Sequence, residues 1–142
     1  MATNSPTIGR NGSAIIIAAG NRLDLQKVTS FHATPRYNTV ASVPLNSPPV
    51  ERYLPNGWDI VFAFDRYNSV GDDFATLLDN TFWSSQSVLT GTIYVTINNP
   101  DGTTTEHEYT DASFRFTSTG NYSGDSVVSY GLSAFAAQRK NV

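Results

Sequence analysis

Apolar and polar positions alternate along most of this chain, which is the pattern of a β-strand with one face in a core. The segment 57–66 shows the pattern most clearly, since four large apolar side chains fall on one face: Trp58, Ile60, Phe62 and Phe64. Smaller or acidic residues fall on the other face. The alternation predicts a central core strand, in which each large side chain contributes on the order of 1.5–3 kcal/mol on burial.

The first half of the chain holds two further expected strands. The continuous apolar run 13–19 predicts a strand that is covered on both faces. The segment 26–37 also alternates, and we expect its strand to stop at Thr34-Pro35, because proline cannot donate to a strand ladder.

The second half predicts a hairpin and two more strands. The runs 88–98 and 103–109 flank Asn99-Pro100-Asp101-Gly102, and Asp-Gly between two β-type runs is a strong hairpin signal. The run 112–118 and the run 127–137 complete the set, and Gln138-Arg139-Lys140 reads as a polar tail.

Only the segment 69–83 has helical spacing. Its apolar stripe consists of Val70, Phe74, Leu77, Leu78, Thr81 and Phe82. Ser69 and Asp72 have the spacing of a capping box, and Asp72 and Asp73 lie in the first turn, where the helix dipole favours anions. The pattern predicts a scaffold helix packed on the β-core, with its carboxylates serving the helix start.

Two segments lack either pattern. Residues 1–12 predict a flexible N-terminal arm, and residues 41–57 predict a long loop stiffened by Pro44, Pro48, Pro49 and Pro55. Long loops in compact domains are usually functional or ordered by a partner. No domain boundary is visible, so we expect a single domain over residues 1–142, mainly β, in which one α-helix packs on the side of a β-barrel or sandwich.

Composition narrows the function. Only 15% of the residues are charged and the net charge is −3, which argues against binding of nucleic acid by clustered basic residues. The absence of cysteine excludes disulfides and thiolate metal sites. The start of the chain is polar, so we expect no signal peptide there. The most apolar run, residues 14–19, is too short to cross a bilayer, so no membrane insertion is expected.

The candidate chemical groups each have a simpler structural explanation. His32 and His107 have no second histidine at metal spacing, and the carboxylates of Glu106 and Glu108 lie on the strand face opposite His107. The remaining candidates are Asp65, Asp72, Asp73 and Asp79 as acid–base groups, Ser84, Ser85 and Ser87 as nucleophiles, and Arg36 with Tyr37 or Arg115 with Phe114 and Phe116 as nucleic-acid contacts. We expect no catalytic, cofactor-binding or metal-binding residue, no cofactor, and no enzyme.

The order of these elements resembles that of bacteriophage tail tube proteins of the contractile type. The resemblance rests on the β-run 56–66, the helix after it, the hairpin 92–103 and the ending Gly124–Arg139, which has Gly-Asp, alternating apolar residues and a small-residue end. The family is related in fold to type VI secretion and bacteriocin tubes, and the resemblance leaves the tube of a non-contractile phage tail open as a close variant.

The resemblance implies a structural virion protein. Six copies form a ring with a continuous β-barrel as inner wall, and rings stack into the tail tube that conducts genomic DNA into the host. The implied partners are further copies of the chain, the tail sheath, baseplate or tape measure, and terminator proteins, while DNA passes without specific binding. The implied location is the virion tail, after assembly in the host cytoplasm. The alternative is a monomeric β-module that binds nucleic acid or carbohydrate.

Overall fold

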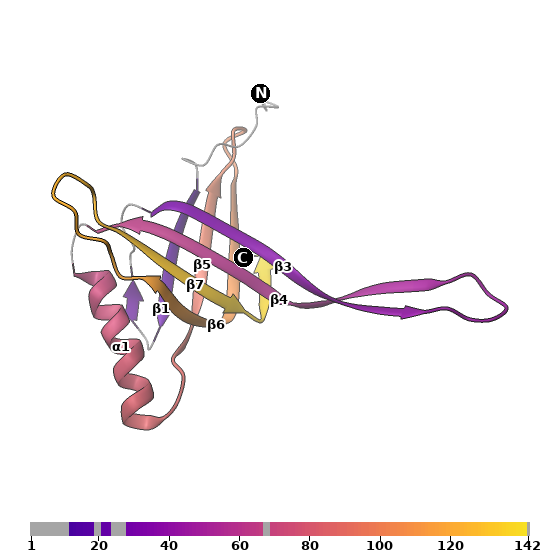
Figure 1. Cartoon of the computed structure of the whole chain (residues 1–142). Helices are drawn as coiled ribbons and strands as arrows, with labels where there is room; N and C mark the ends of the chain where they lie inside the picture. Colours follow the sequence, from indigo (N-terminus) through magenta and orange to yellow (C-terminus); the bar gives the residue numbers. More distant parts are fainter. Residues whose placement is uncertain (1–11, 19–20, 24–27, 67–68, 142) are drawn as a thin grey trace.

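The structure is a computed structural model that describes residues 12–18, 21–23, 28–66 and 69–141. In this part of the chain it contains one antiparallel eight-stranded sheet and one helix (Figure 1). The elements, in chain order, are β1 (Gly12–Ala18), β2 (Asn21–Leu23), β3 (Val28–Ser42), β4 (Val50–Asp65), α1 (Val70–Ser85), β5 (Thr90–Asn98), β6 (Thr104–Ser118), β7 (Ser129–Ala136) and β8 (Gln138–Asn141). The expected mainly β fold with one helix is confirmed.

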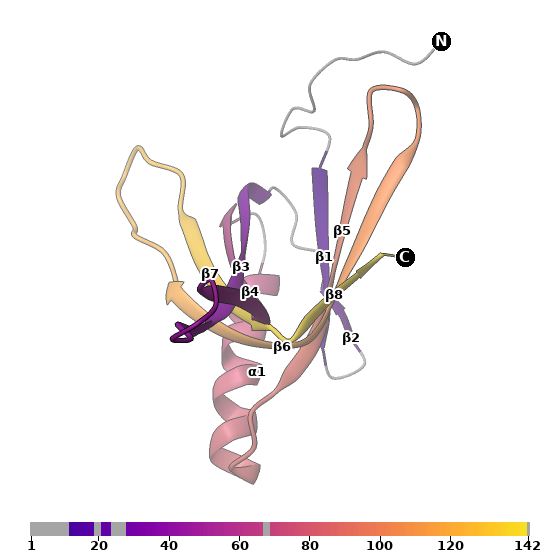
Figure 2. The ribbon, with the colours of Figure 1, turned by 90° about the vertical axis from the view of Figure 1, so that its right-hand side faces the viewer.

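Over the described residues, the sheet is open and bent and does not close into a barrel. Its strand order is β2-β1-β5-β6-β7-β4-β3, and β8 pairs with β6 beside this path. The first part of β6 pairs with β5 and its last part pairs with β7. Asp111 lies between these parts with a φ of 51°, close to a shift in the β5–β6 register. The two halves of the sheet therefore diverge at β6 like the arms of a V (Figure 2).

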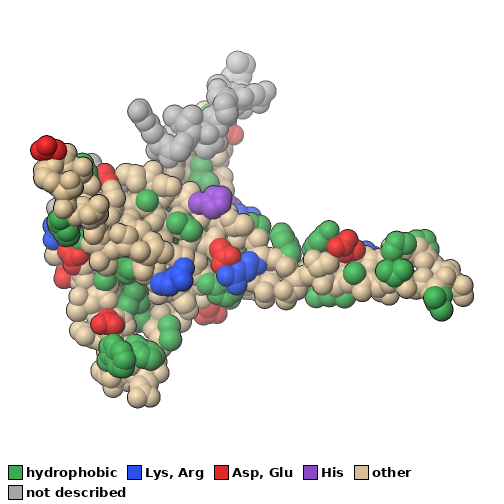
Figure 3. All heavy atoms as spheres, in the orientation of Figure 1, with side chains coloured by type: hydrophobic (Ala, Val, Ile, Leu, Met, Phe, Trp, Pro, Cys, Tyr) green, Lys and Arg blue, Asp and Glu red, His purple; other side chains and the backbone are tan. Residues whose placement is uncertain are grey.

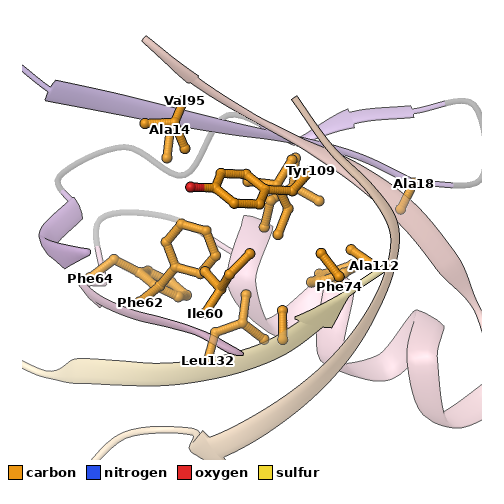
Figure 4. Close-up of a cluster of buried hydrophobic side chains, with 14 of the residues drawn as sticks. Ala14, Ala18, Ile60, Phe62, Phe64, Phe74, Val95, Tyr109, Ala112 and Leu132 are labelled. Atoms are coloured by element: carbon orange, nitrogen blue, oxygen red, sulfur yellow. The ribbon is translucent and has the colours of Figure 1, made fainter. Parts of the chain in front are cut away.

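The core fills the inside of this bend. Ile60, Phe62 and Phe64 of β4 are buried as the alternation predicts, and they face buried side chains from β1, β5 and β6 (Figure 4). Helix α1 contributes Phe74, which is buried and packs edge-on against Phe114 at 5.2 Å between ring centroids. The helix thus packs on the side of the sheet and belongs to the scaffold.

The segment 41–57 is not the long loop that its prolines predict. Strand β3 continues through Pro35 to Ser42, and β4 begins at Val50, so most of the segment belongs to a two-stranded hairpin. The turn is confined to residues 43–49, which include three of the four prolines. Pro35 is tolerated because β3 lies at the edge of the sheet, where a missing N–H need not break a ladder hydrogen bond.

Three other strand predictions differ from the structure. Strand β1 is buried on one face only, through Ala14, Ile16 and Ala18, while Ile17 on the other face is 36% exposed. The segments 103–109 and 112–118 form the single strand β6. The polar tail forms β8, which continues the pairing to β6 after a break at Ala137. Polar composition concealed β8, because all of its side chains are exposed.

Ser69 precedes the helix at the N-cap position, as expected, but its side chain makes no cap hydrogen bond. The Ser69 hydroxyl instead donates to Asp73 Oδ2 at 3.3 Å. At the other end, Gln86 adopts a left-handed conformation with a φ of 54°, and its N–H bonds to the carbonyl of Phe82. The predicted capping box is therefore wrong, and Asp72 is free for the contacts described below. The predicted N-terminal arm lies outside the described residues, apart from Gly12 in β1.

Candidate functional site

Asp72, one of the carboxylates considered as acid–base groups, joins three elements. Its carboxylate accepts a short hydrogen bond from the hydroxyl of Tyr130, the second residue of β7. It also pairs with Arg66, which follows β4, at 3.0 Å from Nη2 to Oδ2. The Nε of Arg66 lies 3.1 Å from the Tyr130 hydroxyl as well. The cluster therefore holds the helix start against the ends of β4 and β7.

The electrostatics of this cluster fit a structural role. The hydrogen bond from Tyr130, followed by the contacts with Arg66, lowers the pKa of Asp72 below its ordinary value. Burial, together with the hydrogen bond to Asp72, raises the pKa of Tyr130 to about 12. The Asp72 carboxylate therefore stays ionised and the Tyr130 phenol stays neutral, so the hydrogen bond between them persists through the neutral pH range. Neither pKa lies near 7, where a general acid or base works best.

The other sequence candidates are dispersed. His32 lies 2.8 Å from the Thr34 hydroxyl, and His107 lies 2.9 Å from Asn141 on β8. Asp65 accepts a hydrogen bond from Ser129, and Ser85 donates to the Thr81 carbonyl within the helix. Arg115 and the two phenylalanines beside it point to opposite faces, as expected, since Phe114 and Phe116 pack on Phe74. Among the described residues, no group of three histidines or carboxylates could hold a metal ion.

No helix in the described ranges has both the length and the apolar character needed to span a membrane. The candidate sites that remain are surfaces. Three of these surfaces are unusual for a monomeric protein.

The first surface is a hairpin that extends far beyond the rest of the molecule (Figures 1 and 3). We call residues 37–55 the hairpin extension. Both of its faces carry apolar side chains. Tyr37 and Tyr53 lie on one face, and Val40 and Leu54 lie on the other, all of them more than half exposed. Leu45 at the tip is fully exposed. A single two-stranded hairpin is only marginally stable in water, and exposed apolar patches are typical of contact sites.

The second surface is a pair of free strand edges. Strands β3, β4, β7 and the last part of β6 form an antiparallel four-stranded unit. Within the described residues, β3 pairs only with β4, and β6 from Phe114 onward pairs only with β7. Both edges therefore carry unpaired backbone groups. The two edge strands run in opposite directions, because three antiparallel pairings separate them.

The free edge of β6 also lines a groove of about 530 Å³ beneath helix α1. The helix side of the groove includes Leu78, Phe82 and Trp83, and the strand side is formed by Phe114, Arg115 and Phe116. Trp83 is 73% exposed, although it packs against Phe82 at 5.2 Å. An unpaired strand edge next to aromatic side chains is a surface that accepts another strand.

The third surface is the face of the four-stranded unit that points away from the core, which we call the polar face. Its side chains come from alternating positions: Ser30, His32, Thr34, Asp59, Val61, Ala63, Asp65, Ser113, Arg115, Ser129, Ser133 and Phe135. Asp59 pairs with Arg36 at 2.6 Å, which neutralises its charge. The polar face therefore carries small, mostly uncharged side chains with few attachment points for phosphate.

Comparison with solved structures shows what this fold is. The chain matches a chain of the anti-feeding prophage cap over 100% of its own length and 94% of the other, with 12% identity and a TM-score of 0.68. It matches a chain of the sheath–tube complex of an extracellular contractile injection system, PVC, in the extended state over 98% and 93%, with 11% identity and a TM-score of 0.67.

A third match is the SPP1 tail tube, with 8% identity, a TM-score of 0.63, and coverage of 96% of this chain and 78% of the other. The chain is thus structurally similar to tail tube proteins and to components of contractile injection systems, as the sequence resemblance implies. The sequence matches no protein-family model. It also matches no curated protein sequence. At these identities, the likeness establishes the fold.

Proposed function

We propose that this chain is the structural subunit of a tail tube in a virion or a phage-like particle. The observation that carries the proposal is the pair of free edges on the antiparallel unit β3-β4-β7-β6. When copies are placed side by side around one axis, β3 of each copy meets β6 of the next. The two strands are antiparallel, so every copy can extend the same sheet.

A heterologous contact of this kind makes a closed ring when its rotation closes, and closure removes both exposed edges. The resemblance to tail tube proteins supports six copies in each ring. In such a ring the polar face lines the bore, because the opposite face of the unit is occupied by the core and helix α1. The bore would then be smooth and close to neutral.

The hairpin extension supplies the contact between stacked rings. It leaves the four-stranded unit along the direction of β3 and β4, and both of its faces offer apolar side chains to a partner. A neighbouring ring would cover these side chains. The N-terminal segment 1–12 is a second candidate for this contact on sequence grounds alone.

The tube would carry genomic DNA during ejection, with electrostatics that leave phosphates unbound. Every copy adds a net charge of −3, and the basic residues on the polar face are few. The tail sheath, baseplate or tape measure, and terminator proteins are the expected partners beyond the chain itself. Assembly would take place in the host cytoplasm, and the protein acts as a scaffold and not as an enzyme.

Sedimentation and negative-stain microscopy of the purified protein test the proposal. Rings or tubes at micromolar to millimolar concentration would support it. A 15.5 kDa monomer throughout this range would contradict it and would favour a monomeric β-module that binds nucleic acid or carbohydrate.

A further inference from the structure

The hairpin extension leaves the sheet at an irregular point. Pro35 pairs with Trp58 and Tyr37 pairs with Pro55, so Arg36 faces two residues, Asn56 and Gly57. This is a β-bulge, and bulges bend the strand that carries the extra residue. The direction of the extension relative to the body is therefore set at this base.

The side of the base that continues the polar face is held by Arg36. Its guanidinium lies 4.8 Å from the centre of the Phe135 ring on β7, and its Nε donates to Asp59 Oδ2 at 2.6 Å. Gly57 lies over the same ring with a φ of +91°, and a Cβ there would sit 2.9 Å from the Ala136 carbonyl oxygen. The strand can pass this close to β7 only because residue 57 is glycine.

The opposite side of the base is held by the last strand. Arg139 of β8 places its guanidinium 4.4 Å from the Trp58 ring, and Trp58 packs edge-on against the buried Tyr109 at 5.7 Å. Strand β8 is itself paired to β6 from Gln138 to Asn141. Trp58 and Asp59 are neighbours in β4, so the two arginines contact consecutive residues of one strand from its opposite faces.

We propose that Arg36 and Arg139 form a two-sided clamp that fixes the direction of the hairpin extension. Each arginine holds β4 against a different neighbour, Arg36 against β7 and Arg139 against β8. The clamp presents the extension at one angle before any partner arrives. Both arginines are positioning residues for the docking of the extension on a second copy. That last step rests on the proposed function, whereas the fixed angle does not.

Pulsed electron-paramagnetic-resonance distances on the subunit test the clamp. The chain has no cysteine, so spin labels at Leu45→Cys in the tip and Asn80→Cys on the exposed side of α1 are specific. We expect one narrow distance distribution in the otherwise unchanged chain. Arg36→Gln and Arg139→Gln should each broaden it, and the double variant should broaden it further.

Arg52→Gln is the matched control. Arg52 lies within the extension, and among the described residues it donates only to the neighbouring Glu51 carbonyl, at 3.1 Å, so its loss should leave the distribution narrow. Thermal unfolding of each labelled variant verifies that the fold is retained, and the single variants decide the question if the double variant does not fold. The clamp would be overturned if the distance distribution had the same width with and without the two arginines, whether that width is broad or narrow.

Electron microscopy of the same unlabelled variants separates the clamp from the proposed function. If the clamp positions the extension for docking, Arg36→Gln should shorten tubes or stop them at single rings. A narrow distribution that broadens in the variants, found in a protein that forms no tubes at all, would uphold the clamp and refute the tube.

Discussion

At the scale of single residues, the polar side chains of this protein fix the relative positions of elements. Asp72 ties α1 to the ends of β4 and β7, and Arg36 ties β3 to β4 and β7. The sequence motif assigned Asp72 to helix capping, since its spacing from Ser69 fits a capping box. The hydrogen bond from Tyr130 could not be foreseen, because Tyr130 is 58 residues away in the chain.

Asp72→Asn should lower the Tm of the subunit by on the order of a few degrees, whereas Asp73→Asn should have less effect. The two carboxylates share the first helical turn, but only Asp72 bonds Tyr130 and Arg66. Calorimetry at neutral pH compares them. An equal loss of Tm in the two variants would show that the stabilisation comes from the helix dipole and not from the contacts of Asp72 with Tyr130 and Arg66.

The same difference should depend on pH. Because the folded state lowers the pKa of Asp72, its stabilising effect is present above the ordinary carboxyl pKa of about 4 and is lost in more acidic solution. The gap in Tm between the wild-type protein and Asp72→Asn should therefore close as the pH falls through that range. A gap that stays constant down to pH 2 would contradict the assignment.

Tyr130 should produce the opposite trend at high pH. Its folded-state pKa is raised to about 12, so the stabilisation is complete below about pH 10 and is lost as the pH rises from 10 to 12. Tyr130→Phe should cost about 1–2 kcal/mol at neutral pH, because a hydrogen bond to a carboxylate disappears. Denaturant unfolding at pH 7 and pH 11 measures both effects, and a cost that persists unchanged at pH 11 would argue against them.

At the scale of elements, the local sequence patterns predicted whether a segment is a strand or a helix better than they predicted where it begins and ends. Alternation identified the buried face of β4, and helical spacing identified α1. The prolines of residues 41–57 led to the wrong prediction of a long loop, because an edge hairpin tolerates proline at positions where a central strand does not. The β8 strand carries no apolar pattern at all, and only its pairing with β6 defines it.

The two ends of helix α1 should respond differently to truncation of a side chain. Phe74→Ala should destabilise the subunit by about 3–5 kcal/mol, because Phe74 is buried between the helix and β6. Leu77→Ala should cost less, since Leu77 is only partly buried. Trp83→Ala should leave subunit stability nearly unchanged and should weaken assembly. A large loss of stability in Trp83→Ala would mean that the helix end serves the core.

The hairpin extension should be separable from the folding of the body. Replacing residues 39–53 by Asn-Gly leaves Asn38 paired with Leu54 and closes the hairpin with a tight turn. The variant should unfold at the same temperature as the full chain and should form rings that do not stack. Tubes of normal length from this variant would show that the extension is not the contact between rings.

At the scale of the whole molecule, the sequence predicted a β fold with one helix but could not show the open sheet. Free edges follow from which strands pair, and pairing depends on contacts between residues far apart in the chain, such as β4 with β7. The polar face likewise becomes a surface only when β3, β4, β7 and β6 are side by side. In the proposed ring, each of these free edges would pair with the edge of a neighbouring copy.

Assembled protein should retain duplex DNA only weakly. The polar face offers Arg115 and a neutralised Arg36–Asp59 pair, and the chain carries more acidic than basic residues. Filter-binding of linear duplex at physiological salt should show no salt-sensitive retention, although non-specific binders typically hold DNA at about 10⁻⁴–10⁻⁶ M. Sub-micromolar binding that falls steeply with salt would mean that the bore binds phosphate.

The proposed tube depends on the association of β3 with β6 of the next copy. A cryo-electron-microscopy reconstruction of the assembled protein that resolves individual strands tests it directly. We expect closed rings in which β3 of each copy lies antiparallel to β6 of its neighbour, with Ser133 and Val61 facing the bore. Rings in which helix α1 lines the bore, or assemblies in which these two edges remain unpaired, would contradict the proposed tube.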